Sequence, residues 1–213
     1  MTGGDFPNAC VGLCNVTSRD SIDAALADFA THTKGQLHIL VNNAGVLSAG
    51  AFEDVEPQAH ELMIEVNVKG FTHVAQAGFP YLRDTPGACM VNLCSASSIH
   101  GIPNLAVYSA TKFYVNGLNQ ALHLEWAPHD IRVTCVKPTL VDTPMGHDVQ
   151  SGTGSSQAIS LQASDIAAAI DRAVSGNRIS YVVGAGIWPI LDKFLPQSLR
   201  AKLVPAVNRE TPR

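Results

Sequence analysis

The chain has 213 residues, of which 46% are apolar and 15% are charged, and its formal net charge is −4. This composition excludes a disordered or fibrous chain and predicts a globular protein with one sizeable core. The basic residues are scattered, so we expect no nucleic-acid partner, and no apolar run is long enough to span a membrane.

The first third of the chain alternates between strand-like and helix-like segments. Ala9–Val16 is short and apolar and predicts a strand. Ser18–Thr31 has apolar residues at helical spacing and predicts an amphipathic helix, with Asp20 or Ser21 as its cap. Leu37–Val41 is almost continuously apolar, which is typical of a strand in a parallel sheet.

The same alternation continues to the end of the chain. A helix is predicted from Pro57 to Leu82, with a bend near Gly78 and Pro80. The later segments are a strand at 88–93, a loop at 95–104, a helix at 105–126, a strand at 131–136, a loop at 138–157, a helix at 163–174 and a strand at 179–183. This order predicts a doubly wound parallel α/β sheet of the Rossmann type. We expect one domain over residues 1–213, with 184–213 as an apolar tail.

The cysteines and histidines favour no metal site. The cysteines are odd in number, contain no Cys-x-x-Cys pair and all lie in apolar, strand-like runs: Cys10, Cys14, Cys89, Cys94 and Cys135. We therefore expect five buried, reduced thiols. The histidines show none of the spacings that bind zinc.

The residues with the clearest chemistry are Tyr108 and Lys112, which lie one turn apart on the helix predicted at 105–126. A nearby ammonium favours the ionised form of a phenol, and such a phenol can exchange a proton with an alcohol or a carbonyl. Ser95 follows a predicted strand and offers a hydroxyl to the same oxygen. Alone, however, a Tyr-x-x-x-Lys pattern also occurs on helices that have no catalytic role.

Other motifs in a fixed order make this pattern specific. They are Asn42-Asn43-Ala44-Gly45 after a strand, Asn67 in a helix, Ser95 after the next strand, Tyr108 with Lys112, and Pro138 with Thr143. Together they resemble the short-chain dehydrogenase/reductase family over about residues 14–145. The resemblance implies an oxidoreductase that transfers a hydride between NAD or NADP and a carbonyl/alcohol pair.

The resemblance also implies a role for each matched residue. Tyr108 would be the general acid/base, Lys112 would lower its pKa and bind the ribose, and Ser95 would hold the substrate oxygen. Asn67 would complete the catalytic set by holding a water. The implied cofactor-binding residues are Asn15, Val16, Asn43, Ala44, Gly45, Tyr108, Lys112, Pro138, Val141 and Thr143. The implied substrate-binding residues are Ser95, His100 and Tyr108.

The chain departs from the family at its start. No Thr-Gly-x-x-x-Gly-x-Gly phosphate loop precedes Asn42, and by alignment the chain begins near the family's third strand. We therefore expect a Rossmann-like fold without its first βαβα segment, with Leu37–Val41 as an exposed apolar edge. The chain is then a fragment, a protein that takes a strand from a second copy, or a degenerate binding protein that no longer holds a dinucleotide. Smaller departures are Asn15 in place of an aspartate and Thr139 in place of a glycine.

Three loops are expected to line the substrate pocket, at 46–52, 96–107 and 140–161. Their candidate wall residues are Leu47, His100, Ile102, Asn104 and Met145. This mainly apolar wall favours a lipophilic alcohol or ketone, with His100 as a second acid/base or simply a loop histidine.

Partners and location are also expectations. The family implies a homodimer or homotetramer formed by the helices at 57–82 and 105–126. The apolar tail would cover the pocket or a subunit contact rather than a membrane surface. Residues 1–5 lack the features of a signal peptide, so we expect a cytoplasmic location.

Overall fold

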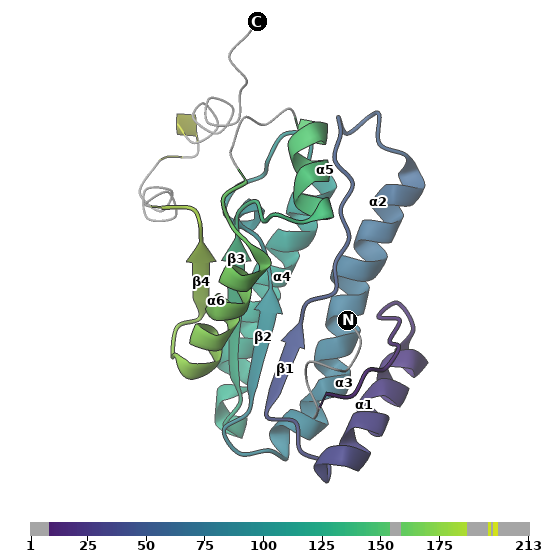
Figure 1. Ribbon diagram of the computed structural model, residues 1–213, viewed down its shortest axis with the longest axis vertical. Coiled ribbons are helices and arrows are strands. Elements are labelled where there is room, and N and C mark those ends of the chain that lie inside the picture. The colour runs from purple at the N-terminus through teal and green to yellow at the C-terminus, as the bar shows by residue number, and fades with distance from the viewer. Residues whose placement is uncertain (1–8, 154–158, 187–195, 197, 200–213) are drawn as a thin grey trace, which may run out of the picture.

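A computed structural model describes residues 9–153, 159–186, 196 and 198–199. They form a four-stranded sheet in the order β1-β2-β3-β4, in which every neighbouring pair is parallel (Figure 1). The strands are β1 (Ile39–Asn42), β2 (Cys89–Leu93), β3 (Arg132–Pro138) and β4 (Ser180–Val183). This arrangement confirms the predicted Rossmann-like parallel sheet.

Helices cover both faces of the sheet. They are α1 (Arg19–Thr33), α2 (Pro57–Ile64), the π-helix η1 (Glu65–Gly70), α3 (Phe71–Arg83), α4 (Ala106–Glu125), α5 (Pro144–Thr153) and α6 (Ala163–Ser175), with short 3-10 turns η2 (Ala96–Ser98) and η3 (Ala127–His129). In Figure 1, α4 lies behind the sheet and α6 lies in front of it. Met90 packs with Leu82 of α3 and Leu122 of α4, whereas its neighbour Val91 packs with Ala169 of α6. The alternating side chains of β2 therefore build one core on each face.

The prediction of a strand at Ala9–Val16 is wrong. Residues 9–15 form no regular secondary structure and pair with no described strand, Val16 lies in a turn, and Val11 and Leu13 are 83% and 100% exposed. An apolar run becomes a strand only when a neighbouring strand accepts its backbone hydrogen bonds.

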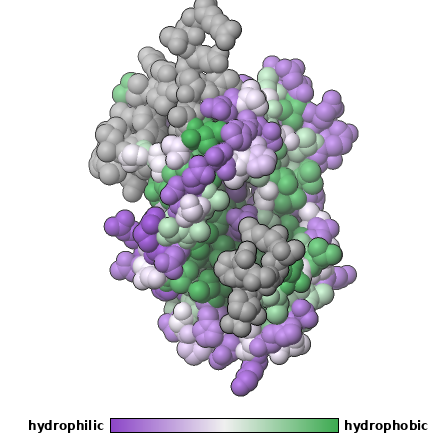
Figure 2. Space-filling model, in the orientation of Figure 1, coloured by the Kyte–Doolittle hydropathy of each residue, from purple (hydrophilic) through white to green (hydrophobic). Residues whose placement is uncertain are grey.

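The expected apolar edge is confirmed at β1. Ile39 and Val41 keep 45% and 39% of their surface exposed, and β1 pairs only with β2 among the described strands. Figure 2 shows hydrophobic surface gathered in the middle of this face of the molecule.

Two helix predictions need correction. Ser18, and neither Asp20 nor Ser21, caps α1, because its hydroxyl accepts a hydrogen bond from Ser21 N. The long helix from Pro57 is interrupted at residues 65–70, where it becomes π-helical, and α3 then continues through the predicted bend near Gly78. A Cβ at Gly78 would lie 2.6 Å from Leu40 Cδ2, so this glycine allows α3 to approach β1 closely.

The region predicted as a loop at 138–157 contains α5. Pro144 begins this helix, at the position where a proline ring fits the first turn. The predicted helix at 163–174 and the last strand are confirmed as α6 and β4. Most of the apolar tail lies outside the described residues.

The cysteine prediction holds for three residues. Cys89, Cys94 and Cys135 are buried and free, whereas Cys10 and Cys14 are free and exposed, because the segment that carries them is not a strand. The described residues contain no cluster of side chains that could hold a metal ion. No helix in the described part of the chain is long and apolar enough to cross a membrane.

Candidate functional site

A cavity of about 1620 Å³ opens at the carboxyl ends of β1, β2 and β3, the place where open α/β sheets bind ligands. The three loops predicted to line the pocket all contribute to it, together with residues from α5 and α6. Leu47, His100, Ile102 and Met145 line it as predicted, but Asn104 does not. Asn104 instead has a left-handed backbone and accepts a hydrogen bond from Gly50 N at 2.9 Å.

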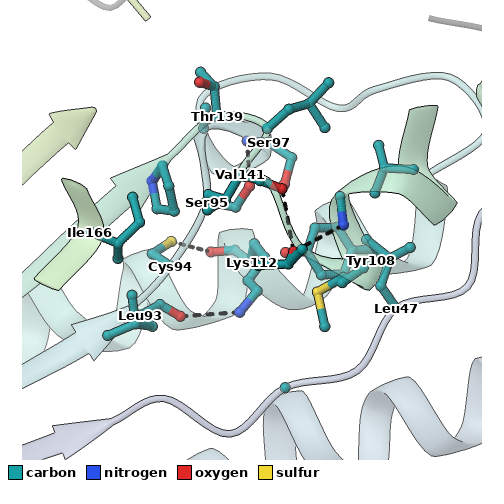
Figure 3. Close-up of a pocket in the computed structure, with 18 of the residues that line it drawn as sticks. Leu47, Leu93, Cys94, Ser95, Ser97, Tyr108, Lys112, Thr139, Val141 and Ile166 are labelled. Atoms are coloured by element: carbon teal, nitrogen blue, oxygen red, sulfur yellow. Dashed lines mark hydrogen bonds between the residues drawn. The ribbon is translucent and has the colours of Figure 1, made fainter. Parts of the chain in front are cut away.

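Ser95 and Tyr108 meet at the wall of this cavity (Figure 3). Ser95 follows β2 and caps the short turn η2, so its Oγ accepts a hydrogen bond from Ser97 N at 3.1 Å. Tyr108 lies in the first turn of α4, and its side chain is hydrogen-bonded to that of Ser95. The loop after the strand and the start of the helix therefore bring the two hydroxyl groups to one point.

The hydroxyl of Tyr108 is buried, although the residue as a whole is half-buried. This burial raises the pKa of Tyr108 to about 12, and the hydrogen bond with Ser95 opposes the rise. The net shift is therefore opposite in direction to the lowering expected from Lys112, because burial of the hydroxyl has the largest effect. The neutral phenol is the dominant form at pH 7 and can donate a proton.

Lys112 is buried, with 5% of its surface exposed, directly beneath Tyr108. Its Nζ donates a hydrogen bond to Leu93 O at 3.1 Å and lies 5.5 Å from the centroid of the Tyr108 ring. Burial lowers the pKa of Lys112, because the charged ammonium is removed from water. Its ammonium points at the end of β2 (Figure 3), which explains why it does not dominate the ionisation of the phenol.

Asn67 lies at the middle of the π-helix, and 1% of its surface is exposed. Its Oδ1 accepts from Val46 N at 2.9 Å, and its Nδ2 donates to Val46 O at 2.9 Å and to Thr111 Oγ1 at 3.2 Å. π-helical turns are rare and often lie at functional sites. Here the turn directs the amide at the loop after β1 and at α4.

The residues expected to hold the reacting half of a dinucleotide do line the cavity: Asn43, Ala44, Gly45, Pro138, Val141 and Thr143. A Cβ at Gly45 would lie 3.4 Å from Asn67 Oδ1 and 3.6 Å from Lys112 Nζ, so a glycine keeps open the space beside these groups. These residues leave a polar recess beside Asn67 and Lys112 that is open to the cavity.

Two expected cofactor residues lie away from the cavity wall. Asn15 and Val16 are not among the residues that line it. The Oδ1 of Asn15 already accepts hydrogen bonds from Thr17 N at 3.0 Å and from Thr17 Oγ1 at 2.8 Å. Asn15 therefore closes its own turn in front of α1.

Sequence reasoning missed two parts of the site. Ile166 and Ile170 of α6 line the cavity, because α6 packs on the face of the sheet that β2, β3 and β4 form. Their helical spacing gave only the signal of a core-facing stripe. Thr111 was also missed, although it lies between Tyr108 and Lys112 and touches Asn67.

The chain is similar to known proteins over most of its length. A family model described as short chain dehydrogenase matches residues 7–154. An uncharacterized oxidoreductase of Staphylococcus epidermidis is 35% identical over 162 residues, which cover 76% of this chain and 68% of the relative.

Solved structures give the same picture. A 3-ketoacyl-(acyl-carrier-protein) reductase from Brucella melitensis, complexed with NADH, is 28% identical with a TM-score of 0.71. The match covers 81% of this chain and 76% of the reductase chain. A short-chain dehydrogenase from Streptomyces avermitilis is 26% identical with a TM-score of 0.78. The match covers 94% of this chain and 80% of the Streptomyces chain.

Proposed function

Because this chain belongs to the short-chain dehydrogenase family, we propose that its cavity catalyses hydride transfer between NAD or NADP and a carbonyl/alcohol pair. The observation that carries the proposal is the meeting of Ser95, Tyr108 and Lys112 at the wall of one cavity. The NADH complex of the similar Brucella reductase supports the choice of cofactor.

The proton steps belong to this chain's own residues. The Ser95 hydroxyl, held by Ser97 N, hydrogen-bonds the substrate carbonyl oxygen. Tyr108, with a pKa of about 12, is protonated at pH 7 and donates its proton to that oxygen as negative charge develops there. In the oxidation direction, the same phenol must take the proton, which requires its ionised form. The ammonium of Lys112, near the ring, stabilises that form.

The cofactor supplies the hydride or accepts it. Asn43, Ala44, Gly45, Val141 and Thr143 are the residues that would hold its reacting end in the cavity. Lys112 Nζ lies close to the open side of Gly45 and would donate a hydrogen bond to a ribose hydroxyl. These residues would hold the cofactor so that its transferable hydrogen faces the Ser95–Tyr108 pair.

The proposed substrate is a lipophilic alcohol or ketone. Apolar side chains from the loop at 46–52, from α5 and from α6 line the cavity: Leu47, Ile102, Met145, Val149, Ile166 and Ile170. His100 is the polar side chain proposed to bind the substrate beyond Ser95 and Tyr108. Its Nδ1 lies 3.0 Å from Gly101 O, so Nδ1 carries the proton and Nε2 of the neutral ring is an acceptor.

We also propose a homodimer or homotetramer. Leu62 and Ile64 on α2 are 51% and 43% exposed, and Phe113 and Tyr114 on α4 are 43% and 39% exposed. These side chains offer the apolar helix faces from which the family assembles.

The test combines binding with turnover. NADH and NADPH are titrated by fluorescence from micromolar to millimolar concentrations, and a series of aliphatic and cyclic ketones is then assayed with the better cofactor. We expect weak binding of the cofactor, turnover that increases with substrate hydrophobicity, and a loss of at least about 100-fold in kcat for Tyr108→Phe.

Tyr81→Phe is the matched control, because Tyr81 packs against the core on α3 and does not line the cavity. If neither cofactor binds and no ketone is reduced at millimolar concentrations, the chain is a non-catalytic binding protein. If Tyr108→Phe keeps its turnover, the assigned acid is wrong.

A further inference from the structure

Thr111 connects two groups of the site that come from different helices. It is 2% exposed, and its Oγ1 donates a hydrogen bond to Tyr108 O at 2.7 Å. The same oxygen accepts a hydrogen bond from Asn67 Nδ2 at 3.2 Å. One hydroxyl therefore links the π-helix to the first turn of α4.

The direction of each of these bonds is fixed. A carbonyl oxygen only accepts, so the single hydroxyl hydrogen of Thr111 must point to Tyr108 O. The lone pairs of Thr111 Oγ1 then face Asn67, and only the NH2 end of that amide can donate to them. Val46 N and Val46 O require the same orientation of the Asn67 amide, so the hydroxyl of Thr111 fits the amide as the loop has turned it and connects it to α4.

This orientation matters for the cavity. With Nδ2 bound to Thr111 and to Val46 O, the Oδ1 atom of Asn67 lies on the side of Gly45. Two of the hydrogen bonds of the Asn67 side chain hold the loop after β1, and a third reaches α4 through Thr111. Loss of the third bond would leave Asn67 tied to the loop but not to the helix that carries Tyr108.

We propose that Thr111 is a positioning residue. It acts through Asn67 and through the backbone of Tyr108 to hold the loop after β1, the π-helix and α4 in the relative positions that the reaction requires. The inference rests on the proposed dehydrogenase function. Thr111 does not touch the substrate in this role, so its loss should slow the reaction without weakening substrate binding.

The test is a pair of substitutions at this position. Thr111→Val has nearly the same shape but no hydroxyl, whereas Thr111→Ser keeps the hydroxyl. We expect kcat to fall about 10-fold in Thr111→Val with KM changed less than twofold, which corresponds to the loss of about one hydrogen bond. Thr111→Ser should restore kcat to within about twofold of the wild type.

Thr85 provides a matched control. It is fully buried, donates to Tyr81 O at 2.7 Å and accepts from Leu37 N at 2.9 Å, and is not a cavity-lining residue. Thr85→Val removes the same kind of two-bond hydroxyl, so it should lower stability and leave kcat unchanged. An equal fall in kcat for Thr85→Val would show that general destabilisation explains the result, and would overturn the inference.

A second readout is independent of activity. Urea unfolding of Thr111→Val, Asn67→Ala and the double variant measures the coupling of the two side chains. We expect the two effects on the unfolding equilibrium constant to be non-additive by about fivefold. Additive effects would overturn the inference even if the wild type proved inactive. An inactive wild type with clear coupling would instead refute the proposed function and leave the structural link standing.

Discussion

Replacing Lys112 by methionine should stabilise the fold while it abolishes the proposed activity. Lys112 is 5% exposed, and no salt bridge in the described part of the chain includes it. Burial of an ammonium costs several kcal/mol. Its hydrogen bond to Leu93 O stabilises the folded state by about 1.5–3 kcal/mol, and its contact with the Tyr108 ring by about 0.5–1 kcal/mol. A net cost of about 1–3 kcal/mol remains, and methionine, of similar shape, avoids it.

The pH dependence gives the sign of this effect. The pKa of Lys112 is lowered in the folded state from the ordinary value of 10.5. Below the folded pKa, both states are charged and the cost is fully present. As the pH rises towards 10.5, the folded state loses its proton first, the unfolded state binds more protons, and the wild type gains stability. The advantage of Lys112→Met should therefore shrink between pH 7 and pH 10.

Urea unfolding at pH 7 and at pH 10 measures the stability advantage of Lys112→Met and its change with pH. Lys69→Met is the control, because the Lys69 side chain is 58% exposed and its replacement should change stability by no more than about 0.5 kcal/mol. A Lys112→Met variant that is less stable than the wild type at pH 7, or whose advantage does not narrow at pH 10, would refute this account of the buried charge.

Three further predictions follow from single contacts. The pKa of Tyr108 is raised to about 12 from 10.0, so the stability that this phenol contributes is complete below pH 10 and is lost as the pH rises through 12. The wild type should therefore lose roughly 1–2 kcal/mol relative to Tyr108→Phe by pH 11, measured by urea unfolding; parallel pH profiles would contradict this. A Cβ at Gly152 would lie 2.6 Å from Ala49 Cβ, so Gly152→Val should push α5 away from the loop after β1 and raise KM several-fold in ketone reduction. An unchanged KM would show that this contact does not close the cavity. Gly117 is exposed within α4 with nothing within 4 Å of a built Cβ, so Gly117→Ala should stabilise the fold by about 0.5–1 kcal/mol; a lower melting temperature would be the contrary result.

The strands and long helices were predictable because their patterns are local. The runs at 88–93 and 131–136 are apolar on both faces, and the structure buries both faces between α4 and α6. The Ala9–Val16 run has the same composition but lies in solvent. A strand depends on its neighbour as well as on its own residues, and a local pattern does not show the neighbour.

The residues of the site that belong to a sequence motif were predictable, whereas the features that depend on packing were not. Ser95, Tyr108, Lys112 and Gly45 were found from their order and spacing, and they lie together as expected. The raised pKa of Tyr108 was not predicted, because it depends on how deeply the hydroxyl is buried. Thr111 was overlooked because a threonine inside a helix gives no signal until its partner across the space between two helices is known.

The π-helical turn at Glu65–Gly70 makes the site sensitive to chain length in a particular way. Such a turn is equivalent to one residue inserted into a regular helix, and each residue of an α-helix turns the chain by about 100°. Deleting one residue there would let α2 continue into α3 as a regular α-helix across residues 65–70. The same deletion would rotate Phe71 and Ala75 away from the core, or Asn67 away from Thr111. Only with the extra residue does the helix keep Phe71 and Ala75 in the core and Asn67 beside Thr111 at the same time. A single-codon deletion in this stretch should therefore be far more damaging than most substitutions within it.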